Sequence, residues 1–196
     1  MFDEKNIWDT FRYGDESSFK LIFEQFYTPL FNYGHKFTVD DHIIEDALQD
    51  LFVKLWKNKD SIRETSSVKN YLYKAFRRVL LRKLSYAPQV VGFSSPEDKL
   101  DFNFQLGHDH TLISQERLQQ IRQSLSDALK KMTPRQREII HLRYYEEMEY
   151  EEIADIMQLS VSSTYKLLYR AIETLRNNLS NTDFLLLLSL LSLKKV

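Results

Sequence analysis

Four polar side chains on one side of a predicted helix form the first group that could do chemistry. They are Glu45, Asp46, Gln49 and Asp50, in the stretch EDALQDLFVKLW, residues 45–56. The other side of this helix carries apolar residues at three- and four-residue steps. These are Ala47, Leu48, Leu51, Phe52 and Leu55. A helix that is buried all round would not carry so many carboxylates and amides, so the polar side is expected to meet a partner or solvent.

A second group combines cations with aromatic rings. Residues 66–84 contain no acid and the bases Lys69, Lys74, Arg77, Arg78, Arg82 and Lys83. Tyr71, Lys74, Arg78 and Arg82 are spaced to form one stripe of a helix. Tyr73 and Arg77 lie between this stripe and the apolar one. Such a surface suits single-stranded DNA, because cations follow the phosphates and bases stack on rings. A charged surface with tyrosines at the rim of the core explains the spacing equally well.

A third group lies at the start of the last long helix. Residues 149–179 predict a short helix over 150–157, a tight connection over 158–160 and a longer helix, which is the pattern of a helix-turn-helix. The second helix of this motif meets base edges with its N-terminal residues. Here these are Ser162, Ser163, Thr164, Tyr165 and Lys166, with Arg170 placed for a phosphate. The alternative is the solvated side of a small helical bundle.

The histidines do not predict a metal site. His108 and His110 flank Asp109, but His35, His42 and His141 lie in other segments, so a full ligand set is not apparent. The sequence also lacks a glycine-rich phosphate loop, a nucleophile elbow and a pair of catalytic carboxylates. We therefore expect no metal, no cofactor, no small-molecule substrate and no catalytic activity. A helical metal-dependent hydrolase is the alternative that a metal assay would test.

The elements that must position these groups are all predicted to be helices. Only 4 Gly and 4 Pro occur in 196 residues, too few for the tight turns of an all-β fold, and good helix formers dominate. Helical spacing covers 19–33, 44–55, 66–84 and 116–132. Asp40 or Asp41 is the expected N-cap of the second of these helices. Thr133, followed by Pro134, is the expected N-cap of a further helix.

The predicted fold is all-α, with two small helical domains joined by a flexible linker. The first domain spans residues 6–84. The linker, residues 85–112, contains Pro88, Gly92, Pro96 and Gly107 and no clean periodicity. The second domain, residues 113–179, ends in the helix-turn-helix. A hydrophobic C-terminal tail, residues 180–196, follows it.

Charge and termini limit the possible functions further. The net charge is −1, from 27 basic and 28 acidic residues, whereas a protein that binds DNA unaided is usually basic. The absence of cysteine and the lack of a signal-peptide pattern at the N-terminus indicate a cytoplasmic protein. The apolar run 184–193 is shorter than the ~18 residues of a membrane span. It predicts a packed terminal helix, or alternatively an anchor on a membrane surface.

Together these stretches resemble a bacterial RNA polymerase sigma factor of the extracytoplasmic-function (ECF) group, in the sigma-70 superfamily. EDALQDLFVKLW matches the family's Glu-Asp, Gln-acid, Phe and Leu-Trp spacing, and SVKNYLYKAFRR resembles its promoter-melting helix. Residues 132–176, MTPRQREIIHLRYY onward to ETLR, resemble its domain that reads the −35 element. The variants SVKNYLY and YKLLYRAI are most similar to sigma factors of Bacteroidetes-type bacteria.

The resemblance implies a role for each group of residues. Glu45, Asp46, Gln49, Asp50 and Lys54 would bind core RNA polymerase, on the coiled coil of its largest subunit. The −10 element of promoter DNA would be read and melted by Lys69, Tyr71, Tyr73, Lys74, Arg77, Arg78 and Arg82. The −35 element would be read by Ser162, Ser163, Thr164, Tyr165, Lys166 and Arg170. A membrane-associated anti-sigma factor would be the regulator.

Four positions depart from the family pattern. Arg78 stands where family members usually carry Asn, Ser163-Thr164 where Thr-Val is frequent, and Tyr165 where Lys is frequent. These departures concern the promoter sequence that is read. Two alternatives remain: a helix-turn-helix regulator that is not a polymerase subunit, and a sigma-like interaction module that has lost promoter activity.

Overall fold

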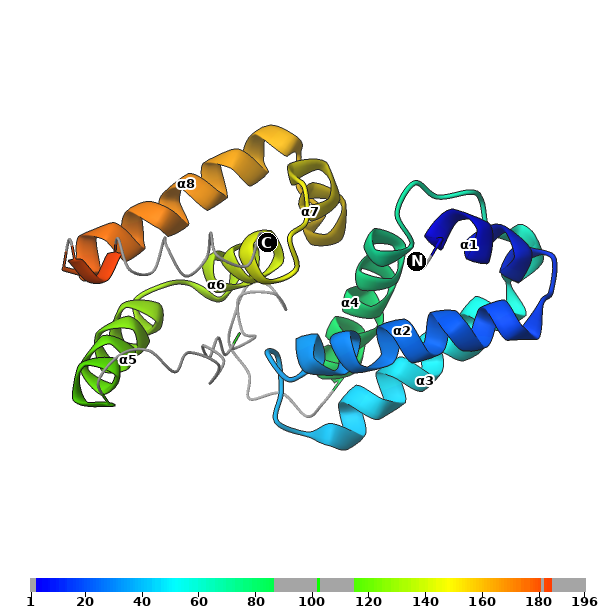
Figure 1. Ribbon diagram of the computed structural model, residues 1–196, viewed down its shortest axis with the longest axis horizontal. Coiled ribbons are helices and arrows are strands. Elements are labelled where there is room, and N and C mark those ends of the chain that lie inside the picture. The colour runs from blue at the N-terminus through cyan, green and yellow to red at the C-terminus, as the bar shows by residue number, and fades with distance from the viewer. Residues whose placement is uncertain (1–2, 87–101, 103–114, 181, 185–196) are drawn as a thin grey trace. The chain divides into compact units, whose positions relative to one another are not determined.

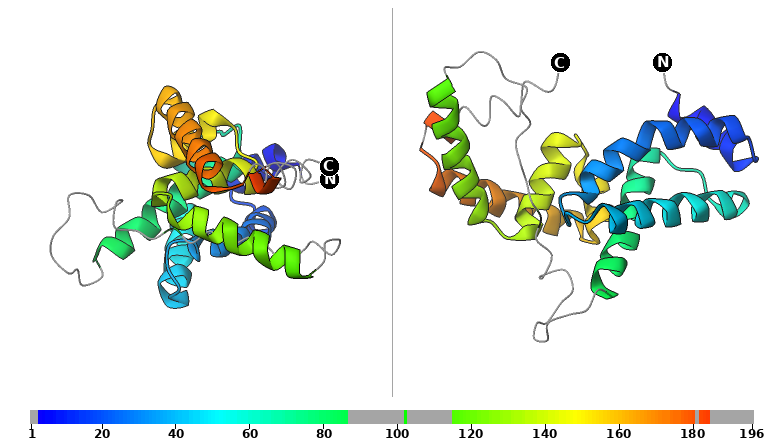
Figure 2. Two further views of the ribbon diagram at one scale, coloured as in Figure 1. Left: turned by 90° about the vertical axis from the view of Figure 1, so that its left-hand side faces the viewer. Right: turned by 90° about the horizontal axis from the view of Figure 1, so that it is seen from below.

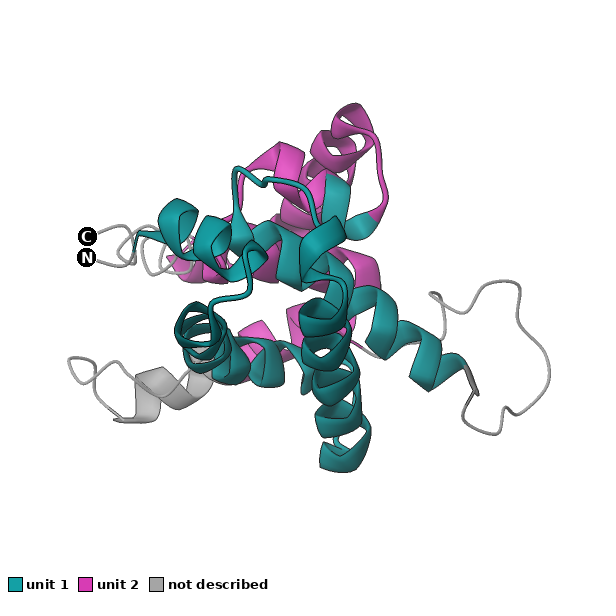
Figure 3. Cartoon of the chain, turned by 90° about the vertical axis from the view of Figure 1, so that its right-hand side faces the viewer, with its two compact units in different colours: residues 1–101, 155–157 teal, residues 102–154, 158–196 magenta. Residues whose placement is uncertain are grey.

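The computed structural model describes residues 3–86, 102, 115–180 and 182–184, with the side chains of 115–122 left undescribed. The described residues are helical and contain no strand. The chain forms two compact units, residues 1–101 with 155–157 and residues 102–154 with 158–196 (Figure 3). The expected all-α fold is therefore confirmed.

Four helices and one 3₁₀ turn build the first unit (Figure 1). They are α1 (Glu4–Arg12), α2 (Glu16–Gly34), α3 (Asp41–Lys57), the 3₁₀ turn η1 (Lys59–Ser61) and α4 (Val68–Tyr86). Aspartates cap the first three helices: Asp3, Asp15 and Asp40 each accept a hydrogen bond from a backbone amide of the first turn. Each cap satisfies an amide that the helix itself leaves unpaired, so these local sequences fix where the helices begin.

Helices α2, α3 and α4 pack against one another around an apolar core (Figures 1 and 2). The largest buried side chains of this core are Trp8, Phe11, Tyr33, Tyr73 and Phe76. Gly34, at the end of α2, allows the helices to approach closely. A Cβ atom at Gly34 would lie 2.7 Å from Ile44 Cγ2 and 3.2 Å from Phe76 Cζ, so a larger residue would force neighbouring groups apart.

Helix α1 was not predicted as a separate element, although Trp8 and Phe11 have helical spacing. Two hydrogen bonds connect it to the segment after η1. Trp8 Nε1 donates to the Arg63 carbonyl at 3.2 Å, and Arg12 Nε donates to the Ile62 carbonyl at 2.7 Å. Trp8 and Phe11 are buried against the other helices. Tertiary contacts therefore stabilise a helix that is too short to be stable alone.

The remaining elements are α5 (Gln115–Lys130), α6 (Pro134–Ile140), the π-helical turn η2 (His141–Tyr145), α7 (Tyr150–Met157) and α8 (Val161–Asn178). They belong to the second unit, except for residues 155–157 at the end of α7. Thr133 forms a capping box with Gln136, and Pro134 occupies the first helical position, as the sequence predicts. Between α7 and α8 lie only residues 158–160. Gln158 adopts a positive φ of 55°, and the Leu159 amide donates to the Ala154 carbonyl at 2.8 Å. Ile153 and Ala154 are buried, so the predicted helix-turn-helix is present.

No described helix is long and apolar enough to cross a membrane. The predicted linker lies outside the described residues except for Ser85, Tyr86 and Phe102. The hydrophobic tail beyond Phe184 also lies outside them.

Candidate functional site

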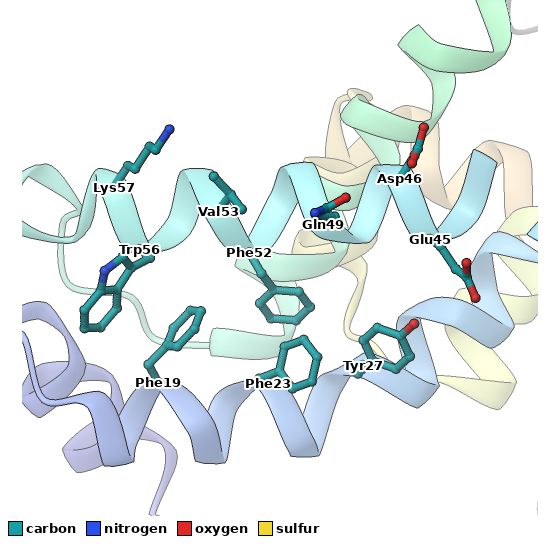
Figure 4. A pocket seen from close by; sticks show the side chains of 10 residues that line it. All are labelled: Phe19, Phe23, Tyr27, Glu45, Asp46, Gln49, Phe52, Val53, Trp56 and Lys57. Carbon is teal, nitrogen blue, oxygen red and sulfur yellow. The ribbon is translucent and has the colours of Figure 1, made fainter. Parts of the chain in front are cut away.

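A groove between α2 and α3 is the first candidate site (Figure 4). Its volume is about 580 Å³. Large aromatic rings from two helices form its floor: Phe19, Phe23 and Tyr27 from α2, and Phe52 and Trp56 from α3. The rings contact one another across the groove, with 4.8 Å between the centroids of Phe23 and Phe52 and 5.1 Å between those of Phe19 and Trp56. The two helices thus present an apolar trough.

Polar residues of α3 border this trough along one side. Glu45, Asp46 and Gln49 are exposed and line the groove, with Val53 and Lys57 further along α3. The position of the first three agrees with the prediction that they face outward. Lys54 is also exposed, but it does not line this groove. The site therefore combines an apolar floor with a mainly acidic rim.

Asp50 is partly exposed and is engaged by a residue of α4. Lys83 Nζ lies 3.2 Å from Asp50 Oδ2 and 3.9 Å from Asp46 Oδ2. One lysine thus lies beside two of the three carboxylates of the polar face. Because Lys83 belongs to the basic helix, this ion pair links the two groups that the sequence pointed to separately.

Trp56 and the aromatic residues of α2 were not among the predicted site residues. Trp56 packs against Phe19, and Lys59 Nζ lies 4.6 Å from the centre of its ring. However, it is only half-buried and also borders the groove. Phe23 remains 39% exposed, which is unusual for a ring so close to a core.

The outer face of α4 is the second candidate site. Lys74, Arg78 and Arg82 are exposed along it, as their spacing predicts. Tyr71 is half-buried on the same face, where its ring meets Trp8 edge-on at 5.0 Å. This burial raises the pKa of the Tyr71 phenol above its ordinary value of 10.0, because the charged form is poorly solvated there. The face therefore offers three cations beside a partly accessible ring.

Two residues assigned to this DNA-binding face are buried instead. Tyr73 is 0% and Arg77 3% exposed. The ring of Tyr73 packs against Tyr33 of α2, with 5.1 Å between centroids, and Lys69 Nζ lies 5.6 Å from the centre of the same ring. Neither side chain is therefore exposed for a direct contact with DNA in this conformation, and their part in the −10 contact stays a prediction. Because α2 and α3 both pack on α4, its buried stripe is wider than the sequence alone indicates.

The N-terminal half of α8 is the third candidate site. Ser160 caps the helix, and its hydroxyl accepts from the Ser163 amide at 3.1 Å. The exposed side chains that follow are Ser162, Ser163, Tyr165, Lys166 and Arg170. Thr164 was also expected here, but it is 0% exposed. Its hydroxyl donates to the Ser160 carbonyl at 3.1 Å, so Thr164 packs inside the motif in this conformation, and its contact with DNA stays a prediction.

Comparisons with known proteins match both units. Residues 22–87 match the family model for sigma-70 region 2, and residues 122–175 match the model for sigma-70, region 4. The chain is similar to the RNA polymerase sigma factor YlaC of Bacillus subtilis, with 26% identity over 169 residues that cover 84% of this chain and 94% of YlaC. It is also similar to the ECF RNA polymerase sigma factor SigM of Bacillus subtilis, with 24% identity, covering 79% of this chain and 91% of SigM.

Solved structures share the fold. The structure of CnrH in complex with the cytosolic domain of CnrY matches with a TM-score of 0.59 and 18% identity, covering 88% of this chain and 94% of that one. The sigma factor RpoE in complex with the anti-sigma factor NepR, from Bartonella quintana, matches with a TM-score of 0.52 and 21% identity. That match covers 81% of this chain and 94% of RpoE. At this level of identity the likeness concerns the fold alone.

Proposed function

Because the chain belongs to the sigma-70 family and is an RNA polymerase sigma factor of its ECF group, we propose how its three exposed faces divide the work of transcription initiation. The groove and polar face of α3 bind core polymerase. The outer face of α4 acts on the −10 element, and the start of α8 reads the −35 element. The chain has no catalytic activity of its own and works in the cytoplasm, as a subunit of the polymerase.

The groove between α2 and α3 suits an amphipathic helical partner. A helix of this kind lays its apolar face into a trough and its polar face along the rim. The aromatic floor would take the apolar face, and Glu45, Asp46, Gln49 and Asp50 would pair with cationic or amide groups beside it. Lys54, exposed on the same helix, would extend the contact. The coiled coil of the polymerase's largest subunit is the partner that we assign to it.

The face of α4 suits melted DNA. Lys74, Arg78 and Arg82 are spaced to follow a phosphate backbone, and the accessible edge of Tyr71 offers a platform for one base. Lys69, which is half-buried at the start of α4, would extend the cationic stripe. Tyr73 and Arg77 contribute by holding α4 in place from inside. Arg78 is the position at which the −10 sequence preference would differ from that of relatives with Asn.

The start of α8 suits the major groove of duplex DNA. Ser162, Ser163 and Lys166 offer hydrogen-bonding groups of short and medium reach, and Arg170 lies further along for a phosphate. With a net charge of −1, the free chain would bind promoters poorly. The polymerase would supply the missing electrostatic attraction.

We also propose an anti-sigma factor as the regulator. The sigma factor RpoE is bound to the anti-sigma factor NepR in its solved structure, and CnrH is bound to the cytosolic domain of CnrY. A partner that covers the groove would compete with polymerase for the same surface. A membrane-associated anti-sigma factor would then release the chain when an external signal arrives.

The observation that carries this proposal is the presence of both sigma-70 regions in one chain, in order, each with an exposed face of suitable chemistry. We expect the purified chain to pull down core polymerase and to support run-off transcription from its own upstream region. The double variant Asp46→Lys/Asp50→Lys should lose polymerase binding and transcription while keeping its circular dichroism spectrum and melting temperature.

A matched control distinguishes loss of the binding site from the change in net charge. Asp60→Lys/Glu64→Lys changes the net charge by the same amount, at exposed acids that do not line the groove. This control should bind polymerase nearly as well as wild type. Binding of wild-type strength by the Asp46/Asp50 variant would show that the polar face of α3 is not the docking surface. Sequence-specific DNA binding without polymerase would instead identify an autonomous helix-turn-helix regulator.

A further inference from the structure

Three side chains, Arg143, Tyr150 and Tyr165, contact one another in series and form a ladder that ends on the recognition helix α8. The rings of Tyr150 and Tyr165 stack with 4.0 Å between their centroids and 24° between their planes. Tyr150 is the first residue of α7, whereas Tyr165 lies in the second turn of α8. The stack therefore crosses the tight connection of the helix-turn-helix and joins its two helices by side chains. The offset stacking of two rings is itself a favourable contact.

Arg143 holds the other end of the ladder. Its guanidinium lies 4.8 Å from the centre of the Tyr150 ring. Arg143 Nη1 also donates to the Met148 carbonyl at 2.7 Å and lies 3.2 Å from Glu149 Oε2. The Arg143 side chain is only 20% exposed. An arginine fixed by a carbonyl, a carboxylate and a ring has little freedom, so it keeps Tyr150 in one place.

Tyr165 remains accessible despite this support. It is 50% exposed, in the part of α8 that also presents Ser162 and Lys166. Tyr150 covers one face of its ring, which leaves the remainder of the ring and the hydroxyl for a partner. A freely rotating tyrosine on an exposed helix face loses side-chain entropy when it binds a partner. Because the stack already fixes the Tyr165 ring, less entropy is lost on binding.

We propose that Tyr165 recognises the C5-methyl group of a thymine in the −35 element. Tyr150 and Arg143 are the residues that position its ring. This inference rests on the proposed reading of −35 by α8. The major groove offers hydrogen-bonding groups on every base pair, but the thymine methyl is its characteristic apolar feature. Val161 and Tyr169 of α8 are exposed as well, but Tyr165 is the half-exposed ring that the stack on Tyr150 holds beside the polar side chains that open α8.

Replacement of thymine by uracil tests the contact, because it removes only the methyl group and leaves base pairing intact. Holoenzyme formed from core polymerase and the full chain is bound to promoter duplexes with single thymine-to-uracil changes throughout the −35 element, on both strands. We expect one position at which uracil weakens binding about fourfold, the equivalent of one buried methyl group. Tyr165→Ala should bind more weakly and should no longer distinguish thymine from uracil there.

The positioning residues are tested by the same readout. Tyr150→Ala should reduce the thymine-to-uracil ratio at that position toward one, without changing the ratios elsewhere. Tyr150→Phe preserves the stack and should restore the ratio. Arg143→Met should give an intermediate ratio. A general loss of fold would weaken binding at all positions alike, so the position-specific ratio distinguishes positioning from a merely structural role.

Each result has a defined meaning. If wild-type holoenzyme requires the −35 element but tolerates uracil at every thymine, the inference is overturned while the proposed function stands. If holoenzyme does not recognise the −35 element at all, the proposed function fails first. If Tyr150→Phe is as defective as Tyr150→Ala, or if Tyr150→Ala keeps the full ratio, the ladder does not position Tyr165.

Discussion

The groove of the first unit and the recognition helix of the second are both proposed to bind partners, but the two faces are built differently. The groove needs residues from two helices that are distant in the sequence, with Phe19, Phe23 and Tyr27 on α2 meeting Phe52 and Trp56 on α3. The face of α8 comes from a single continuous stretch. Its orientation is set locally, by the Ser160 cap and by the stack on Tyr150.

The difference teaches which kind of stabilisation each face depends on. The groove exists only while α2 and α3 stay packed, so its shape depends on the apolar core beneath it. The face of α8 depends on hydrogen bonds and ring contacts worth about 1 kcal/mol each. Core substitutions should therefore affect the first face strongly, whereas loss of a cap should affect the second face modestly.

The largest expected effect comes from the core of the first unit. Phe76 is 0% exposed, and Phe76→Ala should lower the free energy of unfolding of the first unit by about 3–5 kcal/mol. Both tryptophans, Trp8 and Trp56, belong to the first unit. Chemical denaturation followed by tryptophan fluorescence therefore reports on this unit selectively.

A matched substitution in the second unit provides the control. Leu175 is 3% exposed in α8, and Leu175→Ala should destabilise the second unit by about 2–5 kcal/mol. The helical circular dichroism signal should show this loss, whereas the tryptophan transition should stay near its wild-type midpoint. A tryptophan transition displaced as far by Leu175→Ala as by Phe76→Ala would contradict the division into two separately stable units.

The same contrast explains how much could be predicted from the sequence. The helix-turn-helix, the Thr133 cap and the Asp40 cap follow from neighbouring residues, and the structure places them as expected. The outward position of Glu45, Asp46 and Gln49 follows from the period of one helix. These features depend on contacts within a few residues along the chain.

The misplaced residues depend on packing between helices. Tyr73 and Arg77 lie on the border between two stripes of α4, and only the packing of α2 against α4 decides that Tyr73 is buried. Thr164 was assigned to the exposed side, but its hydroxyl bonds to the Ser160 carbonyl inside the motif. The aromatic groove was missed because no single helix contains it. The sequence did contain one indication of the groove: Phe19, Phe23 and Tyr27 are four residues apart, so they form an aromatic stripe along one side of α2.

A smaller effect should follow when the cap of the recognition helix is removed. Ser160→Ala deletes the hydroxyl that accepts from the Ser163 amide, which should cost about 1 kcal/mol of stability in the second unit. Ser162→Ala is the matched control, since Ser162 is exposed two residues after the cap, and this change should leave stability unchanged while weakening −35 binding. Thermal melts of the two variants measure the contrast. Equal destabilisation by both would show that the cap does not secure α8.

A still smaller effect on stability is expected at the link between α3 and α4. Lys83 pairs with Asp50 and Asp46 from a position that is 27% exposed, and ion pairs near the surface contribute less than about 1 kcal/mol. Lys83→Met should therefore change the fluorescence midpoint little. Because it leaves the polar face more negative, we expect association with core polymerase to become a few-fold faster at low salt and unchanged at high salt. A slower association at low salt would show that Lys83 itself contacts polymerase.

The smallest effect on stability should come from Asp15, the N-cap of α2. Helix α2 forms the aromatic side of the groove, and none of its groove-lining residues is charged. Hydrogen bonds from the Ser18 side chain and amide hold the pKa of Asp15 below 3.8, its ordinary value. A depressed folded pKa means that the ionised carboxylate stabilises the folded state above pH 3.8, and that this stabilisation is lost as pH falls through the folded pKa. Asp15→Asn keeps a capping oxygen but cannot ionise. The difference in fluorescence-monitored stability between wild type and Asp15→Asn should be constant at neutral pH and should shrink in acid. A difference that grows in acid would mean that the charge of Asp15 opposes folding of the groove rather than supporting it.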